Sequence, residues 1–269
     1  MKLALTDDAR EIRQLPFVDN TIVVGGINIG VLNRSEWAER IIRHCRGDKA
    51  ARNKPLVIFA ANSYVVTLFA VDPVFRAGFQ QADAVTADGQ PLVFASWMTK
   101  HPIPERSATT DLFHDVARAA AAADQSFFLL GATERNNGVA EAEIKRMYPK
   151  VRIVGRRHGY FTEDNEHEVV EAIRNARPDI LWVGLGIKKQ VEFVNCNIDL
   201  LRSVGCVITC GGLFDYFTPE IKRAPIWMQN NALEWLFRTW QEPRKYFLRY
   251  LITNPAAVFL LLTRTRTSP

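Results

Sequence analysis

The feature that most restricts the fold of this sequence is a regular alternation of short apolar runs with amphipathic segments, beginning near residue 109. Strand-like segments lie at 125–133, 151–159, 179–186 and 205–212, and helix-like segments lie at 109–124, 138–150, 163–177 and 188–203. Because the connections are short, this order predicts a mostly parallel, doubly wound sheet with helices on both faces. The expected fold class is therefore α/β, with a Rossmann-like sheet.

The first half of the chain adds further elements to this pattern. Residues 55–62 form a continuous apolar run, as expected of a strand buried on both faces, and residues 83–89 predict a second strand that ends in a polar turn. Residues 21–32 predict a hairpin or a strand and turn, followed by a helix at 35–47. No linker or repeat interrupts these elements, so we assign residues 1–225 to one α/β core.

The last 44 residues have a different composition. Residues 226–241 and 243–262 predict two helices, and Pro255 is expected to kink or end the second. The formal net charge of the chain is +5, and six basic against two acidic residues in this segment supply nearly all of it. Arginines beside aromatic and aliphatic side chains are typical of a helix on an anionic membrane surface, although a core-packed helix with snorkelling arginines is the alternative. We assign residues 226–269 to a C-terminal helical, membrane-proximal appendage.

Missing patterns argue against several classes of protein. The four cysteines form no CxxC pair, no Cys/His cluster has zinc spacing and no DxD pattern occurs, so neither a metal site nor a cofactor is expected. A complete GxGxxG and a GxxxxGK[ST] are both missing, which disfavours a dinucleotide-dependent oxidoreductase and a P-loop NTPase. No signal peptide or uninterrupted spanning segment is recognised, which indicates a cytosolic protein. The positive charge lies on an apolar tail, so nucleic-acid binding is not expected.

Polar turns follow the predicted strands, and in a parallel sheet these turns line one edge. The candidate site residues in them are Asn62, Asp88, Gly131, Lys189, Gln190, Gly212 and Asp215. A carboxylate at such an edge is a candidate general base, and glycine-rich turns let backbone N–H groups approach phosphates. An Asp before a Gly is also a common turn residue, so the residues alone leave the role of Asp88 open.

A set of motifs in one order carries a resemblance. They are FAANSY, TADGQPLVF, PERSATTDLF, FLLGAT, VGRRHGYF, ILWVGLGIKKQ, GGLFDYF, KRAP, LEWLFR and EPRKYFLRY. Together, from about residue 22 to about residue 252, they resemble the WecG/TagA/CpsF glycosyltransferases of family 26.

The resemblance implies an inverting, metal-independent glycosyltransferase of bacterial exopolysaccharide, capsule or teichoic-acid-type assembly. Such an enzyme moves a hexose or N-acetylhexosamine (or its uronate) from a UDP-sugar donor to a sugar linked by diphosphate to a polyprenol. The family's members are cytoplasmic and peripherally associated with the inner face of the cell membrane. Some form dimers or trimers, so a homo-oligomer is among the expected partners.

Roles for individual residues follow from the same resemblance. Asp88 matches the Asp of the family's ADG motif, the general base. Asn62 is expected to contact the sugars, and Arg106 to act in catalysis near a donor or acceptor phosphate. Gln190, with Lys189 beside it, is expected near the nucleotide sugar.

In the appendage, Arg238, Arg244 and Arg249 match arginines whose implied role is to hold diphosphate. Lys222 and Arg223 of KRAP are expected to link the core to the appendage. Plain ion pairs are the alternatives: Arg106 with Asp111, and Arg238 with Glu234 one turn earlier.

The sequence departs from the family's motifs at several positions. Ala60 stands where the family has Thr, Lys188 and Val191 replace Pro and Glu, and Thr218 and Pro219 replace Ala-Gly. These departures leave the donor open between UDP-N-acetylmannosamine, the family's best-known donor, and UDP-glucose in a β-glucosyltransferase of exopolysaccharide assembly. A non-catalytic nucleotide-sugar-binding assembly partner is a second alternative.

Overall fold

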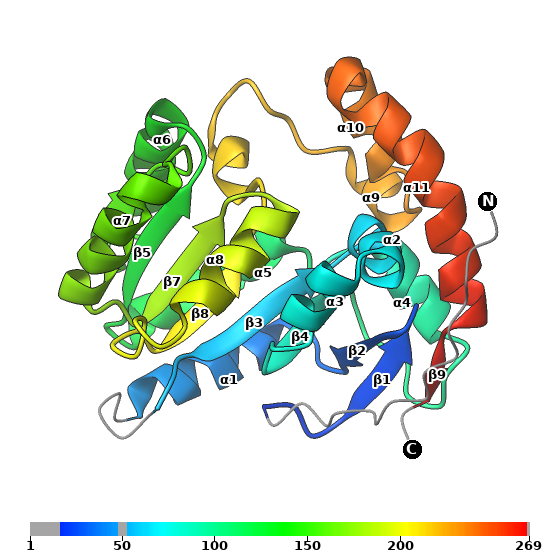
Figure 1. Ribbon diagram of the computed structural model, residues 1–269, viewed down its shortest axis with the longest axis horizontal. Coiled ribbons are helices and arrows are strands. Elements are labelled where there is room, and N and C mark those ends of the chain that lie inside the picture. Colours follow the sequence, from blue (N-terminus) through cyan, green and yellow to red (C-terminus); the bar gives the residue numbers. More distant parts are fainter. Residues whose placement is uncertain (1–16, 48–52, 268–269) are drawn as a thin grey trace.

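The computed structural model describes residues 17–47 and 53–267 and is organised around a six-stranded parallel sheet of order β4-β3-β8-β7-β5-β6 (Figure 1). Its strands are β3 (Leu56–Ala61), β4 (Ala84–Ala87), β5 (Ser126–Gly131), β6 (Arg152–Arg157), β7 (Ile180–Gly184) and β8 (Cys206–Thr209). All neighbouring pairs are parallel. The predicted doubly wound α/β fold is thus confirmed, and β5, β7 and β8 read as continuous apolar runs because every one of their residues is buried.

Helices cover both faces of this sheet. One face carries α2 (Ser63–Val71), α3 (Pro73–Phe79), α7 (Glu163–Ala176) and α8 (Ile187–Asn197); the other carries α1 (Arg34–Arg46), α5 (Thr109–Ala122) and α6 (Glu134–Met147). Phe193 belongs to the first core, whereas Trp37 and Phe113 belong to the second, and all three are 0–1% exposed. Burial of such large side chains in two layers is what holds the sheet rigid beneath its edge.

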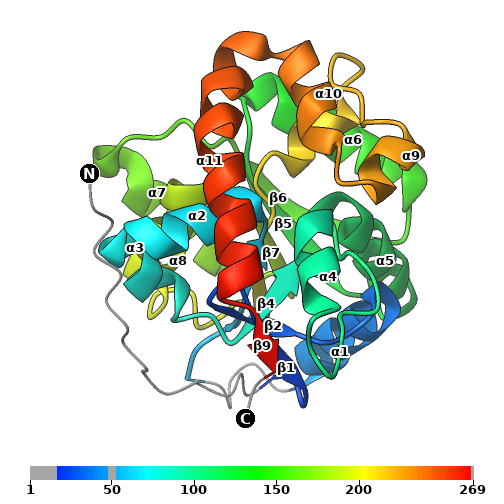
Figure 2. The ribbon, with the colours of Figure 1, turned by 90° about the vertical axis from the view of Figure 1, so that its right-hand side faces the viewer.

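Three helices have no clear signal in the sequence: α2, α3 and α4 (Gln90–Ser96). In α2 the side chains from Val65 to Phe69 are all buried, because the helix lies between the sheet and the C-terminal helix (Figure 2). A helix buried on all sides shows no amphipathic period, so its sequence resembles that of a buried strand. The side chain of Asn62 caps it by accepting from the Val65 N–H.

A small antiparallel sheet, of order β2-β1-β9, adjoins the larger one. The predicted hairpin is β1 (Thr21–Val24) and β2 (Ile27–Gly30), and Gly25 and Gly26 adopt the positive φ angles that a tight turn of this kind requires. The third strand, β9 (Arg266–Thr267), comes from the far end of the chain and pairs with β1. This pairing fastens the C-terminal segment to the core.

The C-terminal segment contains three helices, α9 (Ile226–Asn230), α10 (Glu234–Gln241) and α11 (Pro243–Thr263). Ala232, at a φ of 59°, separates the first two, so the single helix predicted at 226–241 is wrong. The expectation that Pro255 could end the last helix is also not met. Thr253 on one side of it and Leu260 and Leu261 on the other are all buried, so packing holds both halves in one helix despite the missing N–H.

Candidate active site

A cleft of 1610 Å³ opens where the parallel strands end, between the sheet and the C-terminal helices. The turns after β3, β4, β7 and β8 line it, as do α4, the 3₁₀ helix η1 (Leu213–Phe217), α10 and α11. The predicted site residues that line it are Asn62, Asp88, Arg106, Lys189, Gln190, Gly212, Asp215, Arg238 and Arg249. A pocket for one small ligand is roughly 300–1,000 Å³, so this cleft has room for two.

Asp88 lies in the cleft directly after β4, with one carboxylate oxygen fixed by α5. Its Oδ1 accepts from the Thr109 backbone N–H at 2.8 Å and from the Thr109 hydroxyl at 3.2 Å. The residue at the cap position of α5 has no side-chain bond to the helix, so Asp88 supplies the acceptor for this helix N-terminus. Asn62 Nδ2 lies 3.5 Å from Asp88 Oδ2. The second oxygen is thus the one left for chemistry.

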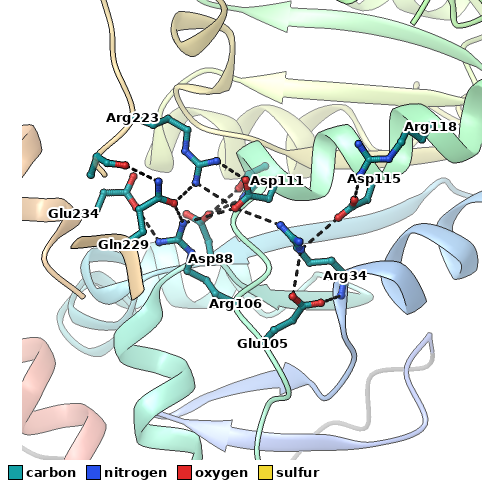
Figure 3. Close-up of polar contacts among 12 residues, drawn as sticks. Arg34, Asp88, Glu105, Arg106, Asp111, Asp115, Arg118, Arg223, Gln229 and Glu234 are labelled. Carbon is teal, nitrogen blue, oxygen red and sulfur yellow. Dashed lines mark hydrogen bonds and ion pairs between the residues drawn. The ribbon is translucent and has the colours of Figure 1, made fainter. Parts of the chain in front are cut away.

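Arg106 also lies in the cleft, but its guanidinium bonds to the C-terminal helices. It donates to Glu234 Oε2 at 2.8 Å and to Gln229 Oε1 at 2.9 Å (Figure 3). The pair with Asp111, the simple alternative from sequence, is longer, at 3.8 Å. Because the Arg106 side chain is only 11% exposed, this bridge is a largely buried connection between the core and α9 and α10.

Arg223 makes a second connection of the same kind. Its guanidinium hydrogen-bonds both carboxylate oxygens of Asp111 on α5 and donates to Gln229 at 2.7 Å. Burial raises the pKa of Asp111, but the Arg223 hydrogen bond and the nearby guanidiniums outweigh it and hold that pKa below its ordinary value. The expectation that Arg223 links the core to the appendage is confirmed. Lys222 takes part through its backbone, which bonds the Gln241 side chain.

The Arg106–Glu234 bridge predicts an unequal effect of two otherwise similar substitutions. Glu234→Gln keeps the shape and removes the charge, so we expect it to lower the free energy of unfolding by about 1.5–3 kcal/mol. Glu220→Gln removes the partner of the exposed Arg135 and should cost about 0–1 kcal/mol. Urea unfolding of both variants measures the difference. Equal effects would show that the Arg106 bridge does not hold the helices in place.

Arg238 and Arg249 converge on a group of tyrosines. The Arg249 guanidinium carbon lies 4.5 Å from the Tyr246 ring centroid, 4.7 Å from that of Tyr250 and 5.0 Å from that of Tyr64. The Arg238 guanidinium carbon also lies near this ring, 5.2 Å from the Tyr246 centroid. The Arg249 Nε is buried and has no hydrogen-bond partner within the described chain. Cation–π contacts hold the two cations without neutralising them, so both remain available to an anion.

Tyr216 closes this part of the cleft from η1. Its ring lies 5.4 Å from the Arg238 guanidinium carbon. Burial raises the pKa of the Tyr216 phenol, against the opposing effect of Arg238, so the hydroxyl stays protonated near neutral pH. It can therefore act as a neutral hydrogen-bond donor beside the two arginines.

Lys189 and Gln190 occupy the opposite part of the cleft, where they hold loops. The Lys189 ammonium donates to the carbonyls of Gly159 and Phe161 and lies 3.9 Å from the Phe161 ring centroid. Gln190 is 4% exposed and accepts from the Gly211 N–H at 3.1 Å. Both side chains therefore support the walls of the cleft rather than project into it.

Asp215 and Gly212 lie in the turn after β8 and line the same wall. Asp215 accepts from the Asn136 side chain at 2.8 Å, which joins η1 to α6. Two predicted site residues lie outside the lining. Gly131 ends β5, where a Cβ would approach the Gly184 carbonyl oxygen to 2.3 Å, so its role is close strand packing. Arg244 is exposed at the start of α11.

The departures from the family's motifs fall at different places in the structure. Ala60 and Lys188 line the cleft, with Lys188 paired to Asp72 at 2.7 Å. Val191 is 3% exposed and packs into the core, near Gly78 of α3, away from the cleft. Thr218 is buried, and its hydroxyl donates to the Asp215 carbonyl. Ala60 is therefore the departure best placed to alter a bound sugar.

Sequence reasoning missed several residues that build this site. Thr109, which holds Asp88, lies within the PERSATTDLF motif, three residues after Arg106, so the motif did mark its neighbourhood. Gln229 and Glu234, which bond Arg106, lie more than 120 residues along the chain, and no local pattern pairs them. In the described ranges no group of three or more His, Cys, Asp or Glu side chains is arranged to hold a metal ion.

Comparison with known proteins adds an independent result. The sequence profile of the glycosyl transferase WecG/TagA/CpsF family matches residues 22–269. An N-acetylglucosaminyldiphosphoundecaprenol N-acetyl-beta-D-mannosaminyltransferase of Bacillus spizizenii is 26% identical over 259 residues, which cover 96% of this chain and 93% of the relative. The protein with the same description from Staphylococcus aureus is 30% identical over 183 residues, covering 68% of this chain and 71% of the relative.

Proposed function

This chain belongs to the WecG/TagA/CpsF family of glycosyltransferases, and from that premise we propose that it transfers a sugar from a UDP-sugar to a polyprenyl-diphosphate-linked sugar, with inversion at the anomeric carbon. The observation that carries the proposal is the position of Asp88 in the lining of a cleft with room for two ligands. The two relatives are named for an acceptor of this chemistry, an N-acetylglucosaminyl diphosphate lipid.

Asp88 is the proposed general base. The bonds from Thr109 fix Oδ1, so Oδ2 receives the proton of the acceptor hydroxyl as that oxygen attacks the anomeric carbon. The bond from the anomeric carbon to the UDP oxygen breaks on the opposite face, and its electron pair leaves with UDP. Asn62, which lies beside Oδ2, is placed to orient a sugar hydroxyl.

We place the donor beside the turns after β7 and β8. The N-terminus of α8 lines the cleft through Gly186, Ile187 and Lys188, and no side chain in the described structure caps it. Its free N–H groups and the positive end of the helix dipole suit a diphosphate, and they can stabilise the charge that develops on UDP. Lys189 and Gln190 contribute by holding the loops around this position.

We place the acceptor diphosphate at Arg238 and Arg249, on the side of the cleft formed by the C-terminal helices. The unpartnered Nε of Arg249 supports this placement, because a buried N–H without an acceptor is costly unless a ligand completes it. Guanidiniums suit phosphate oxygens because they can donate two parallel hydrogen bonds. Arg106 contributes to catalysis by keeping α9 and α10, and so Arg238, in position.

The protein is proposed to lie on the inner face of the cell membrane through α11. Residues Tyr246–Thr263 are long and apolar enough to cross a membrane by length and composition alone. However, α11 packs along α2, and β9 after it pairs with β1, so the helix stays on the protein surface (Figure 2). Its outer face is an apolar stripe of 54–64% exposed side chains: Phe247, Leu248, Leu251, Ile252, Val258, Phe259 and Leu262. Such a face suits burial in the headgroup region.

A vesicle experiment tests this placement. Replacing Phe247 and Leu251 together by Ser should lower partitioning onto phosphatidylglycerol-containing vesicles by about tenfold or more, because two apolar side chains leave the interface. Replacing the exposed Val74 and Leu200, outside the stripe, by Ser serves as the matched control. Sedimentation of the double variants with sucrose-loaded vesicles gives the comparison. Equal partitioning of the two double variants would show that the membrane contact does not lie on α11.

The stereochemical part of the proposal has its own test. Proton NMR of the isolated product reports the configuration of the new glycosidic bond, and inversion of an α-linked UDP-sugar gives a β-linkage. An α-linkage in the product would contradict both the single-displacement mechanism and the role of Asp88 as its general base. The donor panel should include UDP-N-acetylmannosamine and UDP-glucose, because Ala60 faces the cleft where the family has a Thr.

A further inference from the structure

The part of the cleft lined from α4 and α11, here called its arm, has no role so far in the proposed reaction. Its lining residues are Ala95, Trp97, Met98, Val258, Leu261 and Leu262. Ala95 and Leu261 are 8% and 4% exposed, so they form a buried floor. Trp97, Val258 and Leu262 are 54–66% exposed, so they form open apolar walls. The arm is therefore a groove with a protein floor and an open side.

Charged residues lie beyond both ends of the groove, and the stretch between them is uncharged. Arg249, with its unpartnered Nε, lines the same cleft and precedes the groove residues on α11, so its end of the groove is called the inner end. Between Thr253 and Leu262, α11 has no charged residue, and α4 has none either. Basic residues return beyond the outer end, at Lys100 and Arg264. From Arg249 to Leu262 the helix rises by roughly 20 Å, at 1.5 Å per residue. A ligand that fits has an anionic head and an uncharged apolar chain.

Two contacts fix the groove at its outer end. The Lys100 backbone N–H donates to the Thr267 hydroxyl at 3.1 Å, which joins the segment after α4 to β9. The Gly25 N–H donates to the Thr265 hydroxyl, also at 3.1 Å. Beside this end, Leu262 and Phe259 continue into the apolar stripe of α11. A chain leaving the groove would therefore pass directly to the surface that we propose meets the membrane.

We propose that the α4–α11 groove binds the first isoprene units of the acceptor lipid, between the diphosphate at Arg249 and the bilayer at Trp97 and Leu262. This inference rests on the proposed function, since it takes the acceptor to be a polyprenyl diphosphate. The core itself, through Trp97 and Met98, then forms one wall of the lipid site. Filling of the groove orients the acceptor sugar toward Asp88 before reaction.

A filling substitution tests the groove by kinetics. Val258→Trp adds bulk to an exposed wall, and Val74→Trp adds the same ring at an exposed position of α3, outside both the cleft lining and the apolar stripe. In detergent solution, we expect Val258→Trp to lower kcat/KM by roughly tenfold or more for a GlcNAc-diphosphate-farnesyl acceptor. The value for GlcNAc-diphosphate-methyl should stay within about twofold. Val74→Trp should change neither value. An equal loss of kcat/KM for both acceptors, or no loss for either, would overturn the proposal that the groove binds the lipid.

A binding experiment separates the groove from the reaction. Farnesyl diphosphate with a benzophenone at the far end of its chain is cross-linked to the wild-type protein, and mass spectrometry locates the modified peptide. The expected sites are Trp97, Met98 or residues 254–262, with the label displaced by farnesyl diphosphate and not by phosphatidylglycerol micelles. Labelling elsewhere, or none, would contradict the groove even if transfer is observed. Labelling at these sites, without sugar transfer from any donor, would support the lipid groove but contradict the proposed reaction.

Discussion

Replacing Asp88 by Asn is expected to lower turnover by roughly 10²-fold or more, the size typical of a lost general base. The fold should not change, because an Asn oxygen at this position can still accept the two hydrogen bonds from Thr109. What the variant loses is the carboxylate oxygen that takes the proton of the acceptor hydroxyl. Steady-state release of UDP, with each substrate varied in turn, measures the loss in kcat.

The matched control is Asp199→Asn, which removes an exposed carboxylate that pairs with Arg202 on the surface. Its turnover should equal that of the wild type. Thermal unfolding of the Asp88 variant must match the wild type before its kinetics are interpreted. A correctly folded Asp88→Asn variant with normal turnover would assign the proton transfer to another group.

The second large effect is expected for Arg249→Ala. Loss of a charge-assisted bond to phosphate costs about 1.5–3 kcal/mol, so kcat/KM for the lipid-linked acceptor should fall by roughly 10- to 150-fold. The KM for the nucleotide sugar should change little, because Arg249 lies among Tyr64, Tyr246 and Tyr250, on the side of the cleft that we propose for the acceptor. Varying acceptor and donor separately resolves the two constants.

Two further variants make this result specific. Arg249→Lys keeps the positive charge and loses the planar fork, so it should recover only part of the acceptor kcat/KM. Arg266→Ala removes an exposed arginine of β9, outside the cleft, and should behave as the wild type. If Arg249→Ala instead raised only the donor KM, the donor and the acceptor would have to be assigned to the opposite sides of the cleft.

The sheet could be predicted from sequence because its signal is local and repeated. Five of the six parallel strands are short, mostly apolar runs; the exception is β6, RIVGRR, at the edge of the sheet. Asn62 and Asp88 follow strands β3 and β4, which are neighbours, so their proximity follows from the topology. The helix α2 was not predicted, since burial on every side removes the helical period.

The charge pairing in the site could not be predicted in the same way. Arg106 lies in the predicted cleft but binds Glu234 and Gln229, partners from helices that fold back over the sheet. Local spacing favoured Glu234 as a partner of Arg238, one turn away on the same helix. The competing bond to Arg106 prevails in the fold because Arg106 is largely buried and a buried guanidinium needs a strong acceptor.

Under the proposed function, Asp88 lies where a nucleotide sugar and a lipid-linked sugar meet. The most direct measurement is sugar transfer from a panel of UDP-sugars to a GlcNAc-diphosphate-farnesyl acceptor, followed by product mass, with and without EDTA. We expect one preferred donor, a product heavier by one sugar residue and equal rates with and without EDTA. A folded protein that yields no such product with any donor, although it binds UDP-sugar and acceptor together, would contradict the proposed transfer and favour a non-catalytic assembly partner.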